Sequence, residues 1–173
     1  LVVPCYNEEE VLPETSRQLK AVMNSMIEKG KISPESKITF VNDGSKDGTW
    51  DIISSLCAED SLFAGINLSR NRGHQNALLA GLMTAKKYAD AAISLDADLQ
   101  DDVDVVEKMV DNFLAGDDIV YGVRSSRKTD TFFKRFTAEG FYHLMNALGA
   151  DIVFNHADYR LISTRVLESF ADY

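Results

Sequence analysis

Acidic and polar side chains gather in four segments of this sequence, each directly after a short apolar run. The most informative pair is Asp96 and Asp98, separated by Ala97. Residues i and i+2 at the end of a strand point the same way, so both carboxylates can face one ion. Carboxylate oxygens at this spacing suit Mg²⁺ or Mn²⁺ held together with the phosphates of a ligand. The alternative is an acidic turn in which Asp101 or Asp102 caps the following helix.

Asp43 belongs to a second polar segment, Asn42-Asp43-Gly44-Ser45. Asp-Gly is among the commonest turn dipeptides, so a plain turn is one interpretation. A hairpin is excluded because the next segment has helical periodicity. At the end of a strand, the carboxylate of Asp43 can instead accept a hydrogen bond from the edge of a uracil-like base. Gly44 would then let the backbone approach the ligand closely.

The other two segments are Pro4-Cys5-Tyr6-Asn7-Glu8 and residues 69–76. Tyr6 either lies beside a pocket or packs in the core. Residues 70–76 precede a predicted helix, and the N-terminus of a helix favours phosphate groups. His74 has no second His or Cys at metal-ligand spacing, so we do not expect it to bind a metal.

Short apolar runs alternate with segments of helical period along the whole chain. Strands are predicted at residues 1–3, 38–41, 64–68, 91–95 and 119–121, with helices between them. This alternation predicts a single α/β domain with a mostly parallel sheet and helices on both faces. Because ligands bind outside the carboxyl ends of parallel strands, the four polar segments should meet at one edge of the sheet.

The composition limits the classes of partner. With 27 acidic residues against 18 lysines and arginines, the net charge of −9 argues against nucleic-acid binding. Cys5 and Cys57 lie far apart in apolar segments, and we expect buried free thiols in a reducing compartment. No apolar run is long enough to span a membrane. We expect that both ends are trimmed, because the chain starts within an apolar run and ends within a helical pattern.

One segment departs from the acidic character of the chain. Residues 124–135 contain five basic residues and one acid, and follow the fifth predicted strand. A charge run is most often a solvated face, but this one can also hold an anionic ligand. Further on, Asp158 and Arg160 fall in a segment that we interpret as a polar loop, where they form a salt bridge or part of a site.

Taken together, these segments resemble a family. PCYNEEE, NDGSKDG, LSRNRGHQNALLAGL, SLDADLQDD and ADYRLIS occur in the order seen in the family-2 inverting glycosyltransferases. The sequence is most similar to the dolichol-phosphate mannose synthase and bactoprenol-phosphate glucosyltransferase types, over nearly the whole chain. Asn42 departs from the pattern, because the family often has an Asp there. The Gln-x-x-Arg-Trp motif of processive polysaccharide synthases is missing.

The resemblance implies a GT-A fold with a nucleotide-sugar-binding half at residues 1–100 and an acceptor half at residues 101–173. Tyr6, Glu8 and Asp43 would contact the nucleoside, and Asp96 and Asp98 would hold the diphosphate through Mg²⁺ or Mn²⁺. The whole set expected at the nucleotide sugar is Pro4, Tyr6, Asn7, Glu8, Asp43, Ser45, Gly73, Gln75, Asp96, Ala97, Asp98 and Gln100. The residues expected on the acceptor side are Arg124, Arg127, Lys134 and Arg160, with Asp158 as the catalytic residue.

The resemblance further implies metal-dependent, inverting transfer of a sugar from a UDP- or GDP-sugar. The acceptor would be polyprenyl phosphate or, as the alternative, a saccharide in cell-surface polysaccharide synthesis. A hydroxyl acceptor needs a general base, whereas a phosphate with a second pKa near 6 is already largely ionised at neutral pH. Asp158 is therefore either a base or a residue that positions the acceptor.

Such a domain would be soluble and cytoplasmic, working at the cytoplasmic face of a membrane through segments absent from this chain. Homo-oligomerisation stays open. Two other classes are less consistent with the sequence. An aspartyl-phosphate phosphatase usually carries Asp-x-Asp on its first strand, whereas Asp96 follows the fourth. Loss of Asp98 or Asp158 would have favoured a non-catalytic nucleotide-sugar-binding module, but both residues are present.

Overall fold

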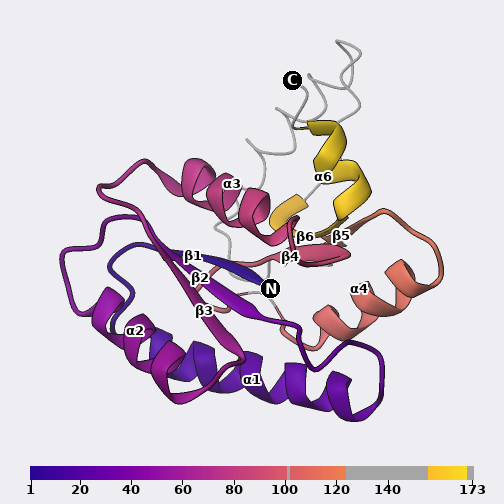
Figure 1. Ribbon diagram of the computed structural model, residues 1–173, viewed down its shortest axis with the longest axis horizontal. Helices are drawn as coiled ribbons and strands as arrows, with labels where there is room; N and C mark the ends of the chain where they lie inside the picture. The colour runs from indigo at the N-terminus through magenta and orange to yellow at the C-terminus, as the bar shows by residue number, and fades with distance from the viewer. Residues whose placement is uncertain (101, 124–155, 171–173) are drawn as a thin grey trace, which may run out of the picture.

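The computed structural model of the protein describes residues 1–100, 102–123 and 156–170 (Figure 1). Strands and helices alternate over most of this length. The elements are β1 (Val2–Cys5), α1 (Leu12–Glu28), β2 (Ile38–Asn42), α2 (Thr49–Glu59), β3 (Phe63–Asn67), α3 (His74–Ala85), β4 (Ala91–Ser94), α4 (Val105–Leu114), β5 (Ile119–Val123), β6 (His156–Ser163) and α6 (Thr164–Phe170). All five predicted strands are present, with ends that differ by at most two residues.

The strands form one sheet in the order β3-β2-β1-β4-β6-β5. β1 pairs in parallel with both β2 and β4, and β2 pairs in parallel with β3. The chain therefore builds outward from β1 in one direction and returns to place β4 on its other side. This reversal between β1 and β4 is the switch point at which open α/β sheets bind ligands.

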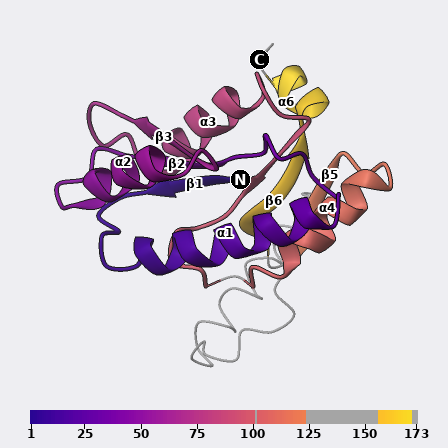
Figure 2. The same ribbon diagram turned by 60° about the horizontal axis from the view of Figure 1, so that its bottom comes forward.

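Helices cover both faces of the sheet, as predicted. Helices α1, α2 and α4 pack on one face, and α3 and α6 pack on the other (Figures 1 and 2). Consecutive strand residues belong to opposite layers, because side chains alternate along a strand. Thus Val3 and Leu161 lie in the core beneath α1 and α4, whereas Val2 and Ile162 lie in the core beneath α3 and α6.

β6 corrects the interpretation of residues 157–163 as a polar loop. This eight-residue strand pairs antiparallel with β4 and with β5, so the sheet is mixed. Tyr159 and Leu161 are buried on one side of the strand, which supplies the apolar surface that a central strand needs. The alternation was visible in the sequence, but the Asp-Tyr-Arg motif obscured it.

A second correction concerns Pro4, which does not end its strand. β1 continues to Cys5, and Pro4 pairs in register with Val41. The hydrogen-bonding groups of successive strand residues point to opposite sides, and Cys5 bonds to β2 through its carbonyl oxygen. The nitrogen of Pro4 therefore faces β4, where the only paired β1 residue is Val2. The missing N–H of the proline costs no ladder hydrogen bond there.

Residues at the ends of α1 and ion pairs on the surface stabilise the helices. α1 has a proline in its first turn and ends before Gly30, whose φ of 69° suits glycine. Lys29 and Lys31, which follow the last residue of α1, form ion pairs with Glu107 of α4. Both cysteines are free, with Cys5 buried and Cys57 half-buried. Within the described residues, no helix combines the length and hydropathy required to cross a bilayer.

Candidate active site

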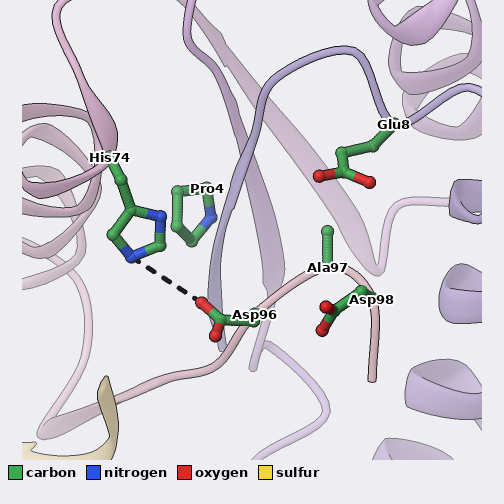
Figure 3. Close-up of a pocket in the computed structure, with 6 residues that line it drawn as sticks. All are labelled: Pro4, Glu8, His74, Asp96, Ala97 and Asp98. Carbon is green, nitrogen blue, oxygen red and sulfur yellow. Dashed lines mark ion pairs between the residues drawn. The ribbon is translucent and has the colours of Figure 1, made fainter. Parts of the chain in front are cut away.

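A pocket of about 340 Å³ opens at the switch point, beside the carboxyl ends of β1 and β4. Its lining comes from three places in the chain that the fold brings together (Figure 3). The lining residues are Pro4, Glu8, His74, Asp96, Ala97 and Asp98. Five of the six belong to the predicted nucleotide-sugar set, and His74 is the addition.

Asp96 and Asp98 face this pocket together, as their spacing predicted. Ala97 between them is 3% exposed and packs into the core, which turns its two neighbours toward the pocket. The helix-capping alternative is not realised at Asp102, whose carboxylate accepts the N–H of Asp104 and leaves α4 without a side-chain cap. Asp101 lies outside the described residues.

Glu8 brings a third carboxylate to the same pocket (Figure 3). Burial raises the pKa of Glu8, and the charges of Asp98, Asp47 and Asp96 raise it further. The pocket therefore concentrates negative charge, which a divalent cation would offset. The described residues contain no group of three or more side chains arranged to ligate a metal ion. A two-carboxylate site fits Mg²⁺ or Mn²⁺ only when ligand phosphate oxygens and waters complete the coordination.

His74 is a pocket residue that the sequence analysis did not predict. It is the first residue of α3, and its Nε2 lies 3.7 Å from Oδ1 of Asp96 (Figure 3). The sequence excludes His74 as a metal ligand and includes it only in the segment 70–76, which precedes a helix N-terminus. Its place at the start of a helix that follows β3 was the available signal, because this position falls at the carboxyl edge of the sheet.

The loops after β1 and β2 bind each other and form one wall beside the pocket. The N–H of Asn7 donates to Oγ of Ser45 (3.0 Å), and the N–H of Lys46 donates to Oδ1 of Asn7 (2.9 Å). The N–H of Glu8 donates to Oγ1 of Thr49 (2.8 Å). Asn7 and Ser45, both predicted to contact the nucleotide sugar, thus also shape the wall. Tyr6 is 41% exposed, so its core-packing alternative is wrong.

Asp43 is 2% exposed and joins the loop after β2 to the loop after β3. Its carboxylate accepts the N–H groups of Arg72 (2.6 Å) and Gly73 (2.9 Å). The loops touch closely, because a Cβ on Gly44 would lie 2.5 Å from the backbone of Arg70. Asn42 takes a supporting role in the same turn, where its Oδ1 accepts the N–H of Ser45. Asp43 therefore has a structural task beside its predicted contact with the base.

Two further predicted contacts, Gln75 and Gln100, lie at the rim of this region. Gln75 is exposed in the first turn of α3, next to His74. Gln100 is exposed in the loop after Asp98, and its N–H donates to Oδ1 of Asp98 (3.2 Å). Their contacts with a nucleotide sugar stay predictions.

Arg160 lies in β6, in register with Ser94 of β4 and Tyr121 of β5. Its Nε is buried and has no hydrogen-bond partner among the described residues. Asp158 precedes Arg160 by two residues in the same strand, and Arg160 pairs with Ser94, the last residue of β4. The side chain of Asp158 lies outside what the structure describes, as do the predicted acceptor residues Arg124, Arg127 and Lys134.

A mixed α/β sheet with an Asp-x-Asp pocket at its switch point defines the class of GT-A glycosyltransferase domains. The chain belongs to glycosyl transferase family 2, whose family model matches residues 1–170. It is 54% identical over 173 residues to the uncharacterized glycosyltransferase YkoT of Bacillus subtilis, a match that covers 100% of this chain and 51% of that protein.

Two further proteins are similar to this chain. The chain is 41% identical over 171 residues to the bactoprenol glucosyl transferase of Shigella phage SfV, covering 98% of this chain and 53% of that protein. Its fold is similar to that of the mannosyltransferase PcManGT from Pyrobaculum calidifontis in complex with GDP-Man and Mn²⁺. The TM-score is 0.60 at 18% identity, over 98% of this chain and 45% of the other. The chain spans about half the length of the curated relatives it matches.

Proposed function

We propose that this domain transfers a sugar from a nucleotide-diphosphate sugar to an acceptor, with inversion at the anomeric carbon. The observation that carries the proposal is the pocket at the switch point, where Asp96 and Asp98 converge with Glu8. Three carboxylates would repel a diphosphate unless a divalent cation lay between them. The proposal agrees with the Mn²⁺ and GDP-Man bound to the similar mannosyltransferase.

Asp96 and Asp98 would hold Mg²⁺ or Mn²⁺, which offsets charge on the departing nucleoside diphosphate as a Lewis acid. The nucleoside would lie toward Tyr6 and Asp43, with Asn7, Ser45 and Gly73 on the surrounding loops and Gln75 in the first turn of α3. Gln100 would lie near the sugar-phosphate. The half of the chain that binds the donor is residues 1–100 in this scheme.

In the transfer step, an acceptor oxygen attacks the anomeric carbon from the face opposite the diphosphate, whose bond to that carbon breaks. This geometry inverts the configuration and depends on how the acceptor is held. We assign Asp158 to this step because it lies two residues from Arg160 in β6, the strand that pairs with β4. It takes the proton of a hydroxyl acceptor, or orients an acceptor that is already ionised.

We propose polyprenyl phosphate as the acceptor. The buried Nε of Arg160 is a guanidinium donor without a partner in the described chain, and a phosphate would satisfy it. Arg124, Arg127 and Lys134 would add positive charge on the same side. The likeness to a bactoprenol glucosyl transferase supports this choice. The whole protein would then work at the cytoplasmic face of a membrane, with the acceptor half at residues 101–173.

The test is a transfer assay with labelled UDP- and GDP-sugars. Each donor is supplied with Mn²⁺, Mg²⁺ or EDTA, and with polyprenyl phosphate or a free saccharide as acceptor. We expect transfer to polyprenyl phosphate from one donor class and none with EDTA. Efficient transfer to the saccharide alone would contradict the lipid acceptor and leave the donor chemistry in place. Binding of a nucleotide sugar without any turnover would instead identify a binding module.

A further inference from the structure

The loop that carries Asp96 and Asp98 is tied to its surroundings at two backbone carbonyls. Oγ1 of Thr15 lies 2.6 Å from the carbonyl oxygen of Ala97, which is the residue between the two carboxylates. The hydroxyl of Tyr159 lies 3.0 Å from the carbonyl oxygen of Asp102. Both donors are buried, Thr15 at 2% and Tyr159 at 4% exposure.

Thr15 reaches the loop from the first turn of α1, far away in sequence. A threonine hydroxyl has one proton, and two carbonyl oxygens lie within reach of Thr15, those of Ala97 at 2.6 Å and Val11 at 3.0 Å. The shorter distance favours donation to Ala97. α1 is a rigid support for this contact, because Leu12 and Leu19 anchor it in the core on either side of Thr15.

The backbone between the two anchors adopts an uncommon conformation. Leu99 has a φ of 49°, in the left-handed region that residues other than glycine rarely adopt. Such a conformation persists where the surrounding structure imposes it. Here the side chain of Leu99 packs against the core, and the carbonyls of Ala97 and Asp102 are fixed on either side. Ala97 and Asp98 are the central residues of a turn in which the backbone nitrogen of Leu99 lies 3.5 Å from the carbonyl oxygen of Asp96, so the direction of the Asp98 carboxylate depends on this turn.

The second anchor connects the loop to β6. The ring of Tyr159 packs beside Gly122 of β5 and Met109 of α4. The packing is close, since a Cβ on Gly122 would lie 2.7 Å from Cδ1 of Tyr159. Tyr159 is also flanked in sequence by Asp158 and Arg160, the residues proposed to meet the acceptor. The Tyr159–Asp102 hydrogen bond therefore joins the strand of the acceptor side to the loop of the donor side.

We propose that Thr15 and Tyr159 are positioning residues of the cation–diphosphate site. By fixing the Ala97 and Asp102 carbonyls, they hold the turn at Leu99 and keep both carboxylates directed into the pocket. Neither residue touches the cation or the substrate. The inference rests on the proposed function, since it assigns a task toward the cation that Asp96 and Asp98 would hold.

The test uses Thr15→Val, which keeps the shape of the side chain and removes its hydroxyl. Thr15→Ser is the rescue variant because it restores the donor. Ser16→Ala is the matched control, since Ser16 is equally buried on the same helix but bonds only to the carbonyl of Pro13. Bound Mn²⁺ is measured by electron paramagnetic resonance titration at saturating UDP, and again at saturating GDP, alongside the melting temperature of each variant.

We expect Thr15→Val to raise the dissociation constant of Mn²⁺ by about tenfold, the usual effect of losing a residue that orients a metal ligand. Thr15→Ser should restore the wild-type value, and Ser16→Ala should stay within about twofold of it. Wild-type Mn²⁺ affinity in Thr15→Val, with only a lowered melting temperature, would overturn the inference. Absence of Mn²⁺ binding in the wild-type chain with either nucleotide would refute the proposed function itself.

Tyr159→Phe keeps the inference testable if Thr15→Val does not fold. It retains the ring against Gly122 and removes the hydroxyl that donates to Asp102. We expect the same titration to show weakened Mn²⁺ binding for Tyr159→Phe. Unchanged Mn²⁺ binding in this variant would show that the hydroxyl of Tyr159 serves folding alone.

Discussion

Replacing Asp43 by asparagine separates two tasks that this carboxylate can have, holding a loop and binding a base. In the structure both of its oxygens accept backbone N–H groups, at 2.6 Å from Arg72 and 2.9 Å from Gly73. Asparagine keeps one acceptor and turns an amide N–H toward the other donor. Losing one buried hydrogen bond to a charged group costs about 1.5–3 kcal/mol. For a domain of this size that corresponds to a decrease of roughly 3–12 °C in melting temperature.

The assay is calorimetry of Asp43→Asn without any nucleotide, with hydrogen exchange at the amides of Arg72 and Gly73. Both amides should exchange faster in the variant, because their acceptor is weakened. Asp51→Asn, an exposed change in the first turn of α2, is the control and should shift the melting temperature little. The reasoning is refuted if Asp43→Asn melts like the wild-type chain and loses only nucleotide binding. Asp43 would then serve the ligand alone.

Three further changes probe the site. UDP or GDP should raise the melting temperature more with Mn²⁺ than with EDTA, and Asp98→Asn should abolish that difference; equal stabilisation with and without metal would contradict the role of Asp98. Asp158→Asn should keep the affinity for the nucleotide sugar, measured by calorimetric titration, and lower the transfer rate by a factor of about 10²–10⁴ if Asp158 is a general base. Loss of nucleotide-sugar binding would show that Asp158 does not belong to the acceptor side of the site. Because the pKa of Glu8 is raised, the folded chain binds this proton more tightly than the unfolded chain does. The free energy of unfolding should therefore fall as the pH rises from 4.5, the usual pKa of a glutamate, through the raised pKa of Glu8. Urea titrations at a series of pH values should show a smaller fall for Glu8→Gln than for the wild-type chain.

The sheet and the convergence of its polar segments were predictable because both depend on local pattern. Apolar runs of strand length and stripes of helical period fix the order of elements, and the switch-point rule then locates the pocket. The same rule predicts that the segments of Glu8 and of Asp96 and Asp98 meet at one edge of the sheet, and all three residues line the pocket. The family resemblance was confirmed over residues 1–170.

The parts that could not be predicted depend on pairing between distant segments. The sequence does not show that residues 156–163 insert between β4 and β5, since antiparallel insertion leaves no local mark. It also gives no sign that Asp43 binds the backbone at Arg72, or that Thr15 reaches Ala97 across 82 residues. Each of these contacts joins a side chain to a main-chain group, and main-chain groups carry no sequence signal.

The register of β5 with β6 has a consequence for how this domain can diversify. Val123 and His156 are paired across the two strands, so the two residues that flank positions 124–155 lie side by side in the sheet. Changing the length of a connection between fixed ends alters its closure entropy only slowly. A connection with both ends fixed in this way can vary in length and sequence, while the pocket at β1 and β4 keeps its geometry. Changes in this connection would therefore leave the strands that lead to Asp96, Asp98 and Glu8 in place.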